Sequence, residues 1–263
     1  MRLHFYKYQG AGNDFVIFDG RKGAINLNTE QIKHIADRHF GIGSDGLIVL
    51  KNSSQADFQM LFYNPDGTSG MMCGNGGRCI VRFAKDIKIV VTNVMSFLAP
   101  DGLHFANIVD DNTVALKMQD VENVEMYNEG IWLDSGTSHF VVKKDDVKKV
   151  DVLKTGKKLR NDARFKKHNG TNVDFYSIIE ENKLLIRTYE RGVENETLAC
   201  GTGIVATALA YSVETNKADG KHSIIIDTLH DSLKVEFVKK ENKFSNIMLI
   251  GGAKKVFEGD INL

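Results

Sequence analysis

Residues 73–85 read CGNGGRCIVRFAK, and residues 200–214 read CGTGIVATALAYSVE. Both stretches open with Cys-Gly-x-Gly and continue with apolar residues three and four apart, the spacing that lines one face of a helix. That face carries Cys79, Ile80, Phe83 and Ala84 in the first stretch and Ile204, Val205, Ala208 and Leu209 in the second. We predict two buried helices of similar design, each beginning at a cysteine.

A second pair of similar segments precedes these helices. Residues 10–19 read GAGNDFVIFD and residues 169–178 read NGTNVDFYSI, so each places an asparagine before a strand that contains Asp-Phe. The order of an asparagine-led strand and then a cysteine-led helix occurs twice. Such a repeat predicts two α+β halves, and at 263 residues the chain has the length of two ordinary domains.

Strand-like runs outnumber the helical ones. A further helix is expected over 29–39, with Thr29 capping its first turn and Ile32, Ile35 and Ala36 on its apolar face. The sequence from Gly41 to Gly46 fits G-x-G-x-x-G but follows a helix and precedes a strand, so we interpret it as a turn. Strands are expected at 15–18, 47–50, 58–63, 87–91, 140–142, 184–189, 223–226 and 233–238.

Composition excludes several classes of function. Lys and Arg together number 34, as do Asp and Glu, so no net charge attracts nucleic acid or anionic lipid. The opening MRLHFYKYQG lacks the apolar core of a secretory signal, and no run of residues is apolar enough to span a membrane. Three widely spaced cysteines do not suit a disulfide framework and fit a reducing compartment. We expect a cytoplasmic protein that binds neither nucleic acid nor membrane.

A cysteine at the first turn of a helix has chemical consequences. The free N–H groups and the positive end of the helix dipole favour a thiolate, so we expect a lowered thiol pKa at Cys73 and Cys200. The same N–H groups can hold a carboxylate, and the glycines let it approach the backbone. Two such helix starts would put a sulfur on each side of an α-carbon. This arrangement predicts an amino-acid racemase in which one cysteine removes a proton and the other delivers one.

The remaining cysteine, the histidines and one Glu-Arg pair are the other candidates for a functional site. Cys79 lies within the apolar face of its helix, and we expect it to be a small buried residue. The histidines are scattered and Cys73 and Cys79 have no second cysteine pair, so no metal and no cofactor is expected. Glu190 and Arg191 follow a strand shortly before Cys200. We interpret them as a substrate clamp, with the arginine binding a carboxylate and the glutamate an ammonium group.

At these residues the chain resembles the diaminopimelate epimerases. The resembling stretches are GAGNDFVIFD, RHFGIGSDGLIVL, FYNPDGTSGMMCGNGGRC, GTSHFVV, NGTNVDF and YERGVENETLACGTG, in that order. The resemblance implies two pseudo-symmetric α+β domains, each with strands wrapped around a central helix, spanning residues 1–113 and 114–251, with residues 252–263 returning to the first. It also implies a homodimer and a cofactor-independent epimerase of lysine and peptidoglycan precursor biosynthesis.

The same resemblance assigns roles to individual residues. Cys73 and Cys200 would be the acid/base pair, and backbone donors of Gly74, Asn75, Gly201 and Thr202 would hold the reacting carboxylate. Recognition of the rest of the substrate would fall to Asn13, Asn64, Asn172, Glu190 and Arg191. His139 would orient a catalytic group. Which cysteine is the thiolate at rest is left open, because coupled thiols share their titration.

Two positions depart from the family pattern. Thr137 stands where the family often has asparagine, and Gly46 stands where some members have glutamine. The change at Thr137 bears on recognition of the far end of the substrate. It therefore leaves open an alternative: a related two-cysteine racemase acting on another amino acid, such as histidine or proline. A thiol hydrolase would give no reason for a second equivalent cysteine.

Overall fold

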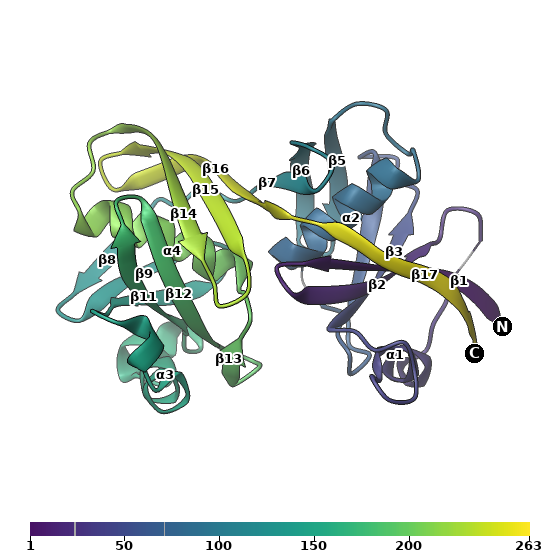
Figure 1. The fold of residues 1–263 in the computed structure, drawn as a ribbon, viewed down its shortest axis with the longest axis horizontal. Coiled ribbons are helices and arrows are strands. Elements are labelled where there is room, and N and C mark those ends of the chain that lie inside the picture. The colour runs from purple at the N-terminus through teal and green to yellow at the C-terminus, as the bar shows by residue number, and fades with distance from the viewer. Residues whose placement is uncertain (24, 71) are drawn as a thin grey trace. The chain divides into compact units, whose positions relative to one another are not determined.

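The computed structural model describes residues 1–23, 25–70 and 72–263. The chain forms two compact units, the first made of residues 1–116 and 251–263 and the second of residues 117–250. The chain passes from one unit to the other within β7 (Thr113–Lys117) and returns within β16 (Lys243–Gly252) (Figure 1). Among the described residues, no helix has both the length and the apolar character needed to cross a membrane.

The first unit is a run of paired strands with helix α2 (Gly74–Asp86) packed against it. The chain order from β1 to β7 is also the order of pairing, and the C-terminal strand β17 pairs antiparallel with β1. Its other elements are β1 (Arg2–Gly10), β2 (Asn13–Asp19), α1 (Thr29–Ala36), β3 (Gly46–Lys51), β4 (Phe58–Tyr63), β5 (Val94–Ala99), β6 (Gly102–Ile108) and β17 (Lys254–Asn262).

The second unit is built in the same way around helix α4 (Gly201–Glu214). Its strands pair in the order β8, β9, β10, β11, β12, β14, β15 and β16, and the short β13 adds to β12. The elements are β8 (Val124–Tyr127), β9 (Gly130–Asp134), β10 (Ser138–Lys143), η1 (Val147–Lys149), α3 (Val152–Arg160), η2 (Ala163–His168), β11 (Asn172–Glu180), β12 (Lys183–Glu190), β13 (Asn195–Thr197), β14 (Gly220–Asp227) and β15 (Ser232–Lys240).

The two units share one pattern of strand directions. In the first, β2–β3 and β4–β5 are parallel and the other neighbouring pairs are antiparallel; in the second, β10–β11 and β12–β14 are the parallel pairs. Matching these patterns aligns β2 with β10, and β3 with β11. The predicted α+β repeat is confirmed, but the equivalence of GAGNDFVIFD and NGTNVDFYSI is wrong, because the first segment forms β2 and the second forms β11.

Each central helix begins where its cysteine stands. Cys73 and Cys200 are the N-cap residues of α2 and α4, with extended backbone angles of φ −101°, ψ 135° and φ −108°, ψ 113°. The apolar faces predicted for both helices are buried. Helix α4 is buried along nearly its whole length, as expected for a helix that strands enclose.

Two local predictions were wrong. Helix α1 ends at Ala36, and its N-cap is Asn28, whose side chain and that of Gln31 satisfy each other's backbone N–H groups. Residues 87–91 do not form a strand. Ile87 is the C-cap of α2 and Lys88 has a φ of 57°, so these apolar residues turn the chain at the end of the helix.

Candidate active site

In the first unit, Cys73 lies beside two asparagine side chains. The first intrahelical bond of α2 runs from the Gly77 N–H to the Cys73 carbonyl, at 2.7 Å, so bonding within the helix starts at Gly77. The Cys73 Sγ lies 3.7 Å from Asn13 Oδ1, and Asn75 Nδ2 lies 3.4 Å from the same oxygen. The structure therefore brings Asn13, Cys73 and Asn75 together.

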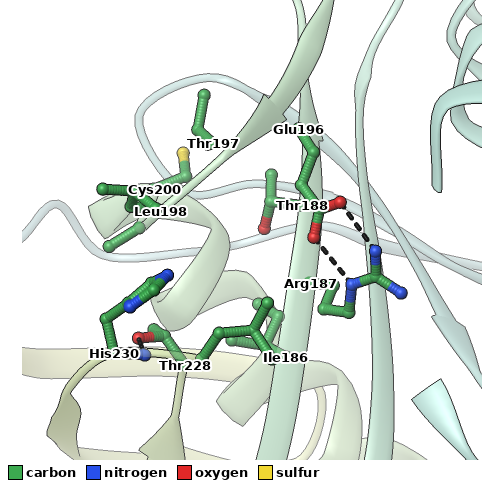
Figure 2. Close-up of a pocket in the computed structure, with 11 residues that line it drawn as sticks. Ile186, Arg187, Thr188, Glu196, Thr197, Leu198, Cys200, Thr228 and His230 are labelled. Carbon is green, nitrogen blue, oxygen red and sulfur yellow. Dashed lines mark hydrogen bonds and ion pairs between the residues drawn. The ribbon is translucent and has the colours of Figure 1, made fainter. Parts of the chain in front are cut away.

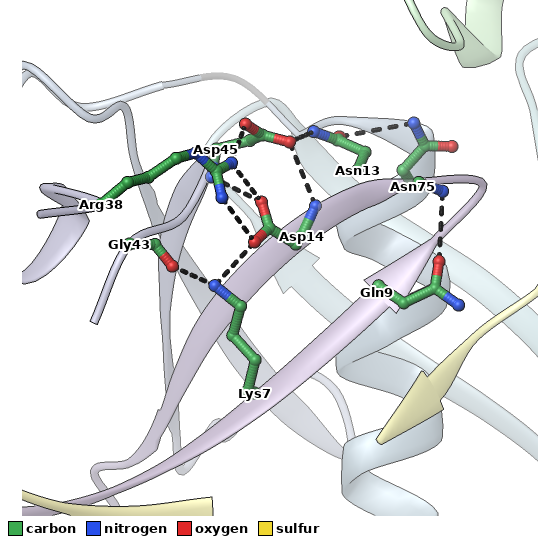
Figure 3. A network of polar contacts seen from close by, with 9 residues as sticks. Lys7, Gln9, Asn13, Asp14, Arg38, Gly43, Asp45 and Asn75 are labelled. Carbon is green, nitrogen blue, oxygen red and sulfur yellow. Dashed lines mark hydrogen bonds and ion pairs between the residues drawn. The ribbon is translucent and has the colours of Figure 1, made fainter. Parts of the chain in front are cut away.

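A network of ionised groups fixes the orientation of Asn13 (Figure 3). Asn13 Nδ2 donates to Asp45 Oδ2 at 2.7 Å, which leaves its Oδ1 facing Cys73 and Asn75. Arg38 bridges Asp45 and Asp14 at 2.7 and 2.8 Å, and the buried Lys7 binds Asp14 at 2.7 Å. Burial works against the charge of Asp14, but the hydrogen bonds from Arg38 and Lys7 outweigh it and hold its pKa well below the usual range.

Arg78 lies fully buried one turn into α2. Its guanidinium donates to Asn75 Oδ1 at 2.8 Å and to the Gly74 carbonyl at 3.2 Å. Because Asn75 Oδ1 accepts from Arg78, the Nδ2 of Asn75 is the group that faces Asn13. Arg78 thus orients a residue of the helix start without itself being at the surface.

Asn64 forms hydrogen bonds with residues of its own turn, Gly67 and Thr68. Its Nδ2 donates to Thr68 Oγ1 at 3.0 Å, and its backbone bonds close the turn that follows β4. The structure therefore shows Asn64 stabilising its own turn. The departure at Gly46 also has a structural reason: a Cβ at this position would come to 2.9 Å from the ring of Phe62.

In the second unit, Cys200 is more enclosed than predicted. It is 9% exposed, and its Sγ lies 3.4 Å from Thr202 Oγ1. Burial, together with the negative charges of Glu190 and Asp174, raises the pKa of Cys200 well above its ordinary value. The expectation of a lowered thiol pKa is wrong for this cysteine, since burial outweighs the help from the Gly203 N–H and the Thr202 hydroxyl.

His139 connects Cys200 to the strands. The parallel pairing of β10 and β11 sets His139 beside Asn172, and their side chains meet at 3.3 Å between Asn172 Nδ2 and His139 Nε2. The same Nε2 lies 2.9 Å from Thr202 Oγ1, while Nδ1 lies 2.6 Å from Asp174 Oδ2. His139 and Asp174 are wholly buried.

The predicted clamp residues lie at the end of β12, where Glu190 is the last residue of the strand and Arg191 follows it. The Arg191 guanidinium donates to Thr137 Oγ1 at 2.8 Å and to the carbonyls of His168 and Gly170, and its backbone N–H donates to Asn172 Oδ1 at 2.7 Å. These acceptors are all neutral, so they do not neutralise the guanidinium charge, which remains available to attract a bound anion. Burial raises the pKa of Glu190.

Cys200 also borders a pocket of about 240 Å³ within the second unit (Figure 2). Thr188 and the ion pair between Arg187 and Glu196, at 2.6 Å, form one wall, and His230 and Thr228 line it farther from the helix start. Thr188 donates to Asp174 Oδ1 at 2.7 Å. The pocket gives a small molecule access to the neighbourhood of Cys200.

Cys79 behaves as predicted for a buried residue. It is wholly buried, and burial raises its pKa to about 12. Such a thiol stays protonated near neutral pH and is a poor nucleophile. Within the described parts of the chain, no cluster of three or more His, Cys, Asp or Glu side chains is arranged to hold a metal ion.

Sequence reasoning missed several residues that support these groups. Asp174 lies two positions after Asn172 in the quoted stretch NGTNVDF, on the same face of its strand, and that period of two was the available signal. No local sequence pattern predicts that Arg78 is buried, since it is a charged residue within an apolar helix face. The network of Lys7, Asp14, Arg38 and Asp45 depends on strand pairing that the sequence does not reveal.

Comparison with known proteins places this arrangement in a family. The family model described as diaminopimelate epimerase matches residues 5–124 and 131–256. The chain is 43% identical to a diaminopimelate epimerase from Flavobacterium psychrophilum, over 98% of this chain and 100% of that protein. It is 39% identical to one from Chlorobaculum tepidum, over 97% of this chain and 99% of that one.

Solved structures agree on the fold. A phenazine biosynthesis protein of the PhzF family from Bacillus anthracis superimposes with a TM-score of 0.79 at 13% identity, and each chain is fully covered. A probable proline racemase from Agrobacterium radiobacter gives a TM-score of 0.72 at 14% identity, over 99% of this chain and 93% of that one. Such low identities establish the two-unit α+β fold alone, whereas the family model and the relatives establish the family. The chain belongs to the diaminopimelate epimerase family.

Proposed function

We propose that this protein is a cofactor-independent epimerase that interconverts LL- and meso-diaminopimelate, with Cys73 and Cys200 as its acid and base. Membership of the family makes the chain an isomerase. The observation that carries the residue assignment is that each unit has a cysteine as the N-cap of its buried central helix, followed by Gly-x-Gly.

The proposed reaction needs three groups around one α-carbon. A thiolate removes the α-proton, and a thiol on the opposite side returns a proton, so the configuration inverts. Backbone N–H groups of Gly74, Asn75, Gly201 and Thr202, at the starts of the two helices, would meet the charge that grows on the carboxylate. Preorganised donors of this kind take the place of an electron sink such as pyridoxal phosphate.

Recognition of the far end of the substrate is assigned to the second unit. Arg191 is held by neutral acceptors and retains its charge for a carboxylate, and Asn172 and Glu190 lie on the strands beside it. Asn13 and Asn64 are proposed to bind the substrate from the first unit. An amino acid without a second head group would leave these donors unpaired in a closed site, which lowers its reactivity by roughly 10⁴-fold.

The assay follows deuterium. The enzyme is incubated in deuterated water with LL-diaminopimelate and, separately, with L-histidine and L-proline, and isotope entry at the α-carbon is measured with the change of configuration. Diaminopimelate should react far faster than the other two. Faster inversion of histidine or proline would assign the chain to the alternative, a two-cysteine racemase of another amino acid.

The cellular setting is a separate part of the proposal, with its own test. We propose that the two compact units are the two domains, that the protein is a cytoplasmic homodimer, and that it serves lysine and peptidoglycan precursor synthesis. Free thiols at Cys79 and Cys200 support a reducing compartment. Light scattering on the purified protein measures the oligomer directly, and a monomer mass would contradict the dimer.

A further inference from the structure

A chain of buried polar groups runs from Cys200 into the second unit. The Cys200 Sγ lies 3.4 Å from Thr202 Oγ1, which lies 2.9 Å from His139 Nε2. His139 Nδ1 lies 2.6 Å from Asp174 Oδ2, and Thr188 donates to the other oxygen of Asp174 at 2.7 Å. His139 and Asp174 have no exposed side-chain surface, and Thr188 is 3% exposed. Water therefore does not compete for the two bonds to Asp174, whereas Thr202 is half-buried at the start of α4.

The direction of these hydrogen bonds follows from one obligatory donor. The backbone N–H of Arg191 donates to Asn172 Oδ1 at 2.7 Å, so the other group on that amide, Nδ2, faces His139 Nε2 at 3.3 Å. An amide Nδ2 only donates. His139 Nε2 must then accept, and it carries no proton.

The rest of the chain is then determined. The ring proton of His139 lies on Nδ1 and is donated to Asp174. Because Nε2 carries no hydrogen, Thr202 donates its hydroxyl hydrogen to it at 2.9 Å, and the Asn172 amide shares the same lone pair as the longer branch at 3.3 Å. The lone pairs of Thr202 Oγ1 remain for Cys200, so the sulfur can bond this oxygen only as a donor, which requires an S–H group.

We propose that Asp174 and Thr202 are positioning residues that hold Cys200 as the protonated thiol before substrate binds. The proposal rests on the assignment of Cys200 as an acid/base group in the proposed function. During turnover the Cys200 S–H bond breaks and its proton joins the electron pair on the α-carbon. The Thr202 hydroxyl then turns from His139 to donate to the new thiolate, and no proton travels along the chain of groups.

Two further observations support the arrangement. A Cβ at Gly203 would come to 2.4 Å from Asp174 Oδ1, so the glycine makes room for this carboxylate against the first turn of α4. Burial and the charges of Glu190 and Asp174 raise the pKa of Cys200, which also favours the thiol.

Asp174→Asn should reverse the orientation of the chain. Thr188 would still donate to the amide oxygen, which turns the amide NH₂ toward His139 Nδ1. Amide donors then face both ring nitrogens of His139, from position 174 at Nδ1 and from Asn172 at Nε2, so the ring proton is no longer held on Nδ1. The form with the proton on Nε2, which donates to Thr202, gains population, and the Thr202 hydroxyl is then free to donate to a Cys200 thiolate. We expect alkylation of Cys200 by iodoacetamide near neutral pH, followed by mass spectrometry of its peptide, to become at least about tenfold faster.

Removing the charge of Asp174 would itself speed alkylation, so the variant is also made together with Thr202→Val. Valine keeps the backbone N–H and removes the hydroxyl. If the hydroxyl carries the effect, Asp174→Asn should speed alkylation no more than about threefold in the valine background. If Asp174→Asn speeds alkylation of Cys200 equally with Thr202 and with Thr202→Val, the proposal is overturned, because the lost charge of Asp174 alone then explains the effect.

A kinetic comparison covers the case in which Asp174→Asn does not fold. Thr202→Val should lower kcat by about tenfold or more with KM within about twofold, because the thiolate loses its hydrogen-bond donor during turnover. Thr202→Ser should restore kcat. An unchanged kcat in the valine variant would contradict the proposal. The alkylation rates need no substrate, so they test the hydrogen-bond chain even if the protein acts on another amino acid.

Discussion

At the scale of single residues, the surroundings of the sulfur atoms separate the three cysteines. Cys79 is wholly buried, Cys73 touches Asn13, and Cys200 touches Thr202 near two carboxylates. The sequence predicted the first of these environments correctly from helical spacing. It did not predict the enclosure of Cys200, because the residues that surround it come from β10, β11 and β12, far away along the chain.

Alanine at each cysteine should separate catalysis from stability. Cys73→Ala and Cys200→Ala should abolish epimerisation, because each removes one of the two proposed proton carriers. Cys79→Ala should keep its activity per folded molecule and lower the free energy of unfolding by about 1–2 kcal/mol, since it opens a small cavity. Activity assays and urea unfolding measure the two effects, and substantial turnover by either of the first two variants would contradict the two-base assignment.

Thr137 offers a second test at this scale. Its hydroxyl accepts from Arg191 at 2.8 Å, and Thr137→Val removes that acceptor while keeping the shape of the side chain. A hydrogen bond to a charged group contributes about 1.5–3 kcal/mol, so we expect KM for diaminopimelate to rise at least about tenfold with little change in kcat. Thr137→Ser is the matched control. An unchanged KM in the valine variant would show that Arg191 is oriented by the two carbonyls alone.

At the scale of elements, helices were easier to predict than the equivalence of strands. A cysteine followed by Gly-x-Gly and an apolar stripe is a local signal, and both central helices begin where it occurs. Strand equivalence depends on which strands pair and in which direction. The shared Asp-Phe motif was therefore misleading, because it lies in strands at different places in the two units.

The cap of α1 can be tested by two neighbouring substitutions. Asn28→Ala removes one bond of the capping box, from the Gln31 N–H to Asn28 Oδ1, and keeps the bond from the Asn28 N–H to the Gln31 side chain, and we expect it to lower the free energy of unfolding by about 1 kcal/mol. Thr29→Ala leaves that box intact and should change the free energy by much less. Urea unfolding and hydrogen exchange at the first turn of α1 measure both. A larger loss at Thr29 would restore the cap that the sequence suggested.

At the scale of the whole molecule, the two units repeat the fold but not the charges at the helix start. When β2 is aligned with β10 and β3 with β11, Asp14 occupies the position equivalent to His139, and Asp45 the position equivalent to Asn172. The first unit fills these positions with carboxylates held by Lys7 and Arg38, and the second with an imidazole and an amide. Composition, with equal numbers of positive and negative residues, gave no sign of this asymmetry.

The asymmetry predicts opposite responses of the two units to pH. The pKa of Asp14 is lowered, so its contribution to stability is present above the ordinary aspartate value of about 3.9 and is lost as the pH falls. The pKa of Glu190 is raised, so its contribution to stability is present below the ordinary glutamate value of about 4.3 and is lost as the pH rises through the raised value.

Asp14→Asn should therefore destabilise the protein at neutral pH by roughly 2–3 kcal/mol, because Lys7 is left buried without its charged partner. This difference from the wild type should shrink below about pH 4. Glu190→Gln should stabilise it at neutral pH and lose that advantage in acid. Free energies of unfolding measured between neutral and acidic pH for both variants test these signs. Parallel curves for the wild type and Asp14→Asn would show that the Lys7 and Arg38 contacts do not shift the titration of Asp14.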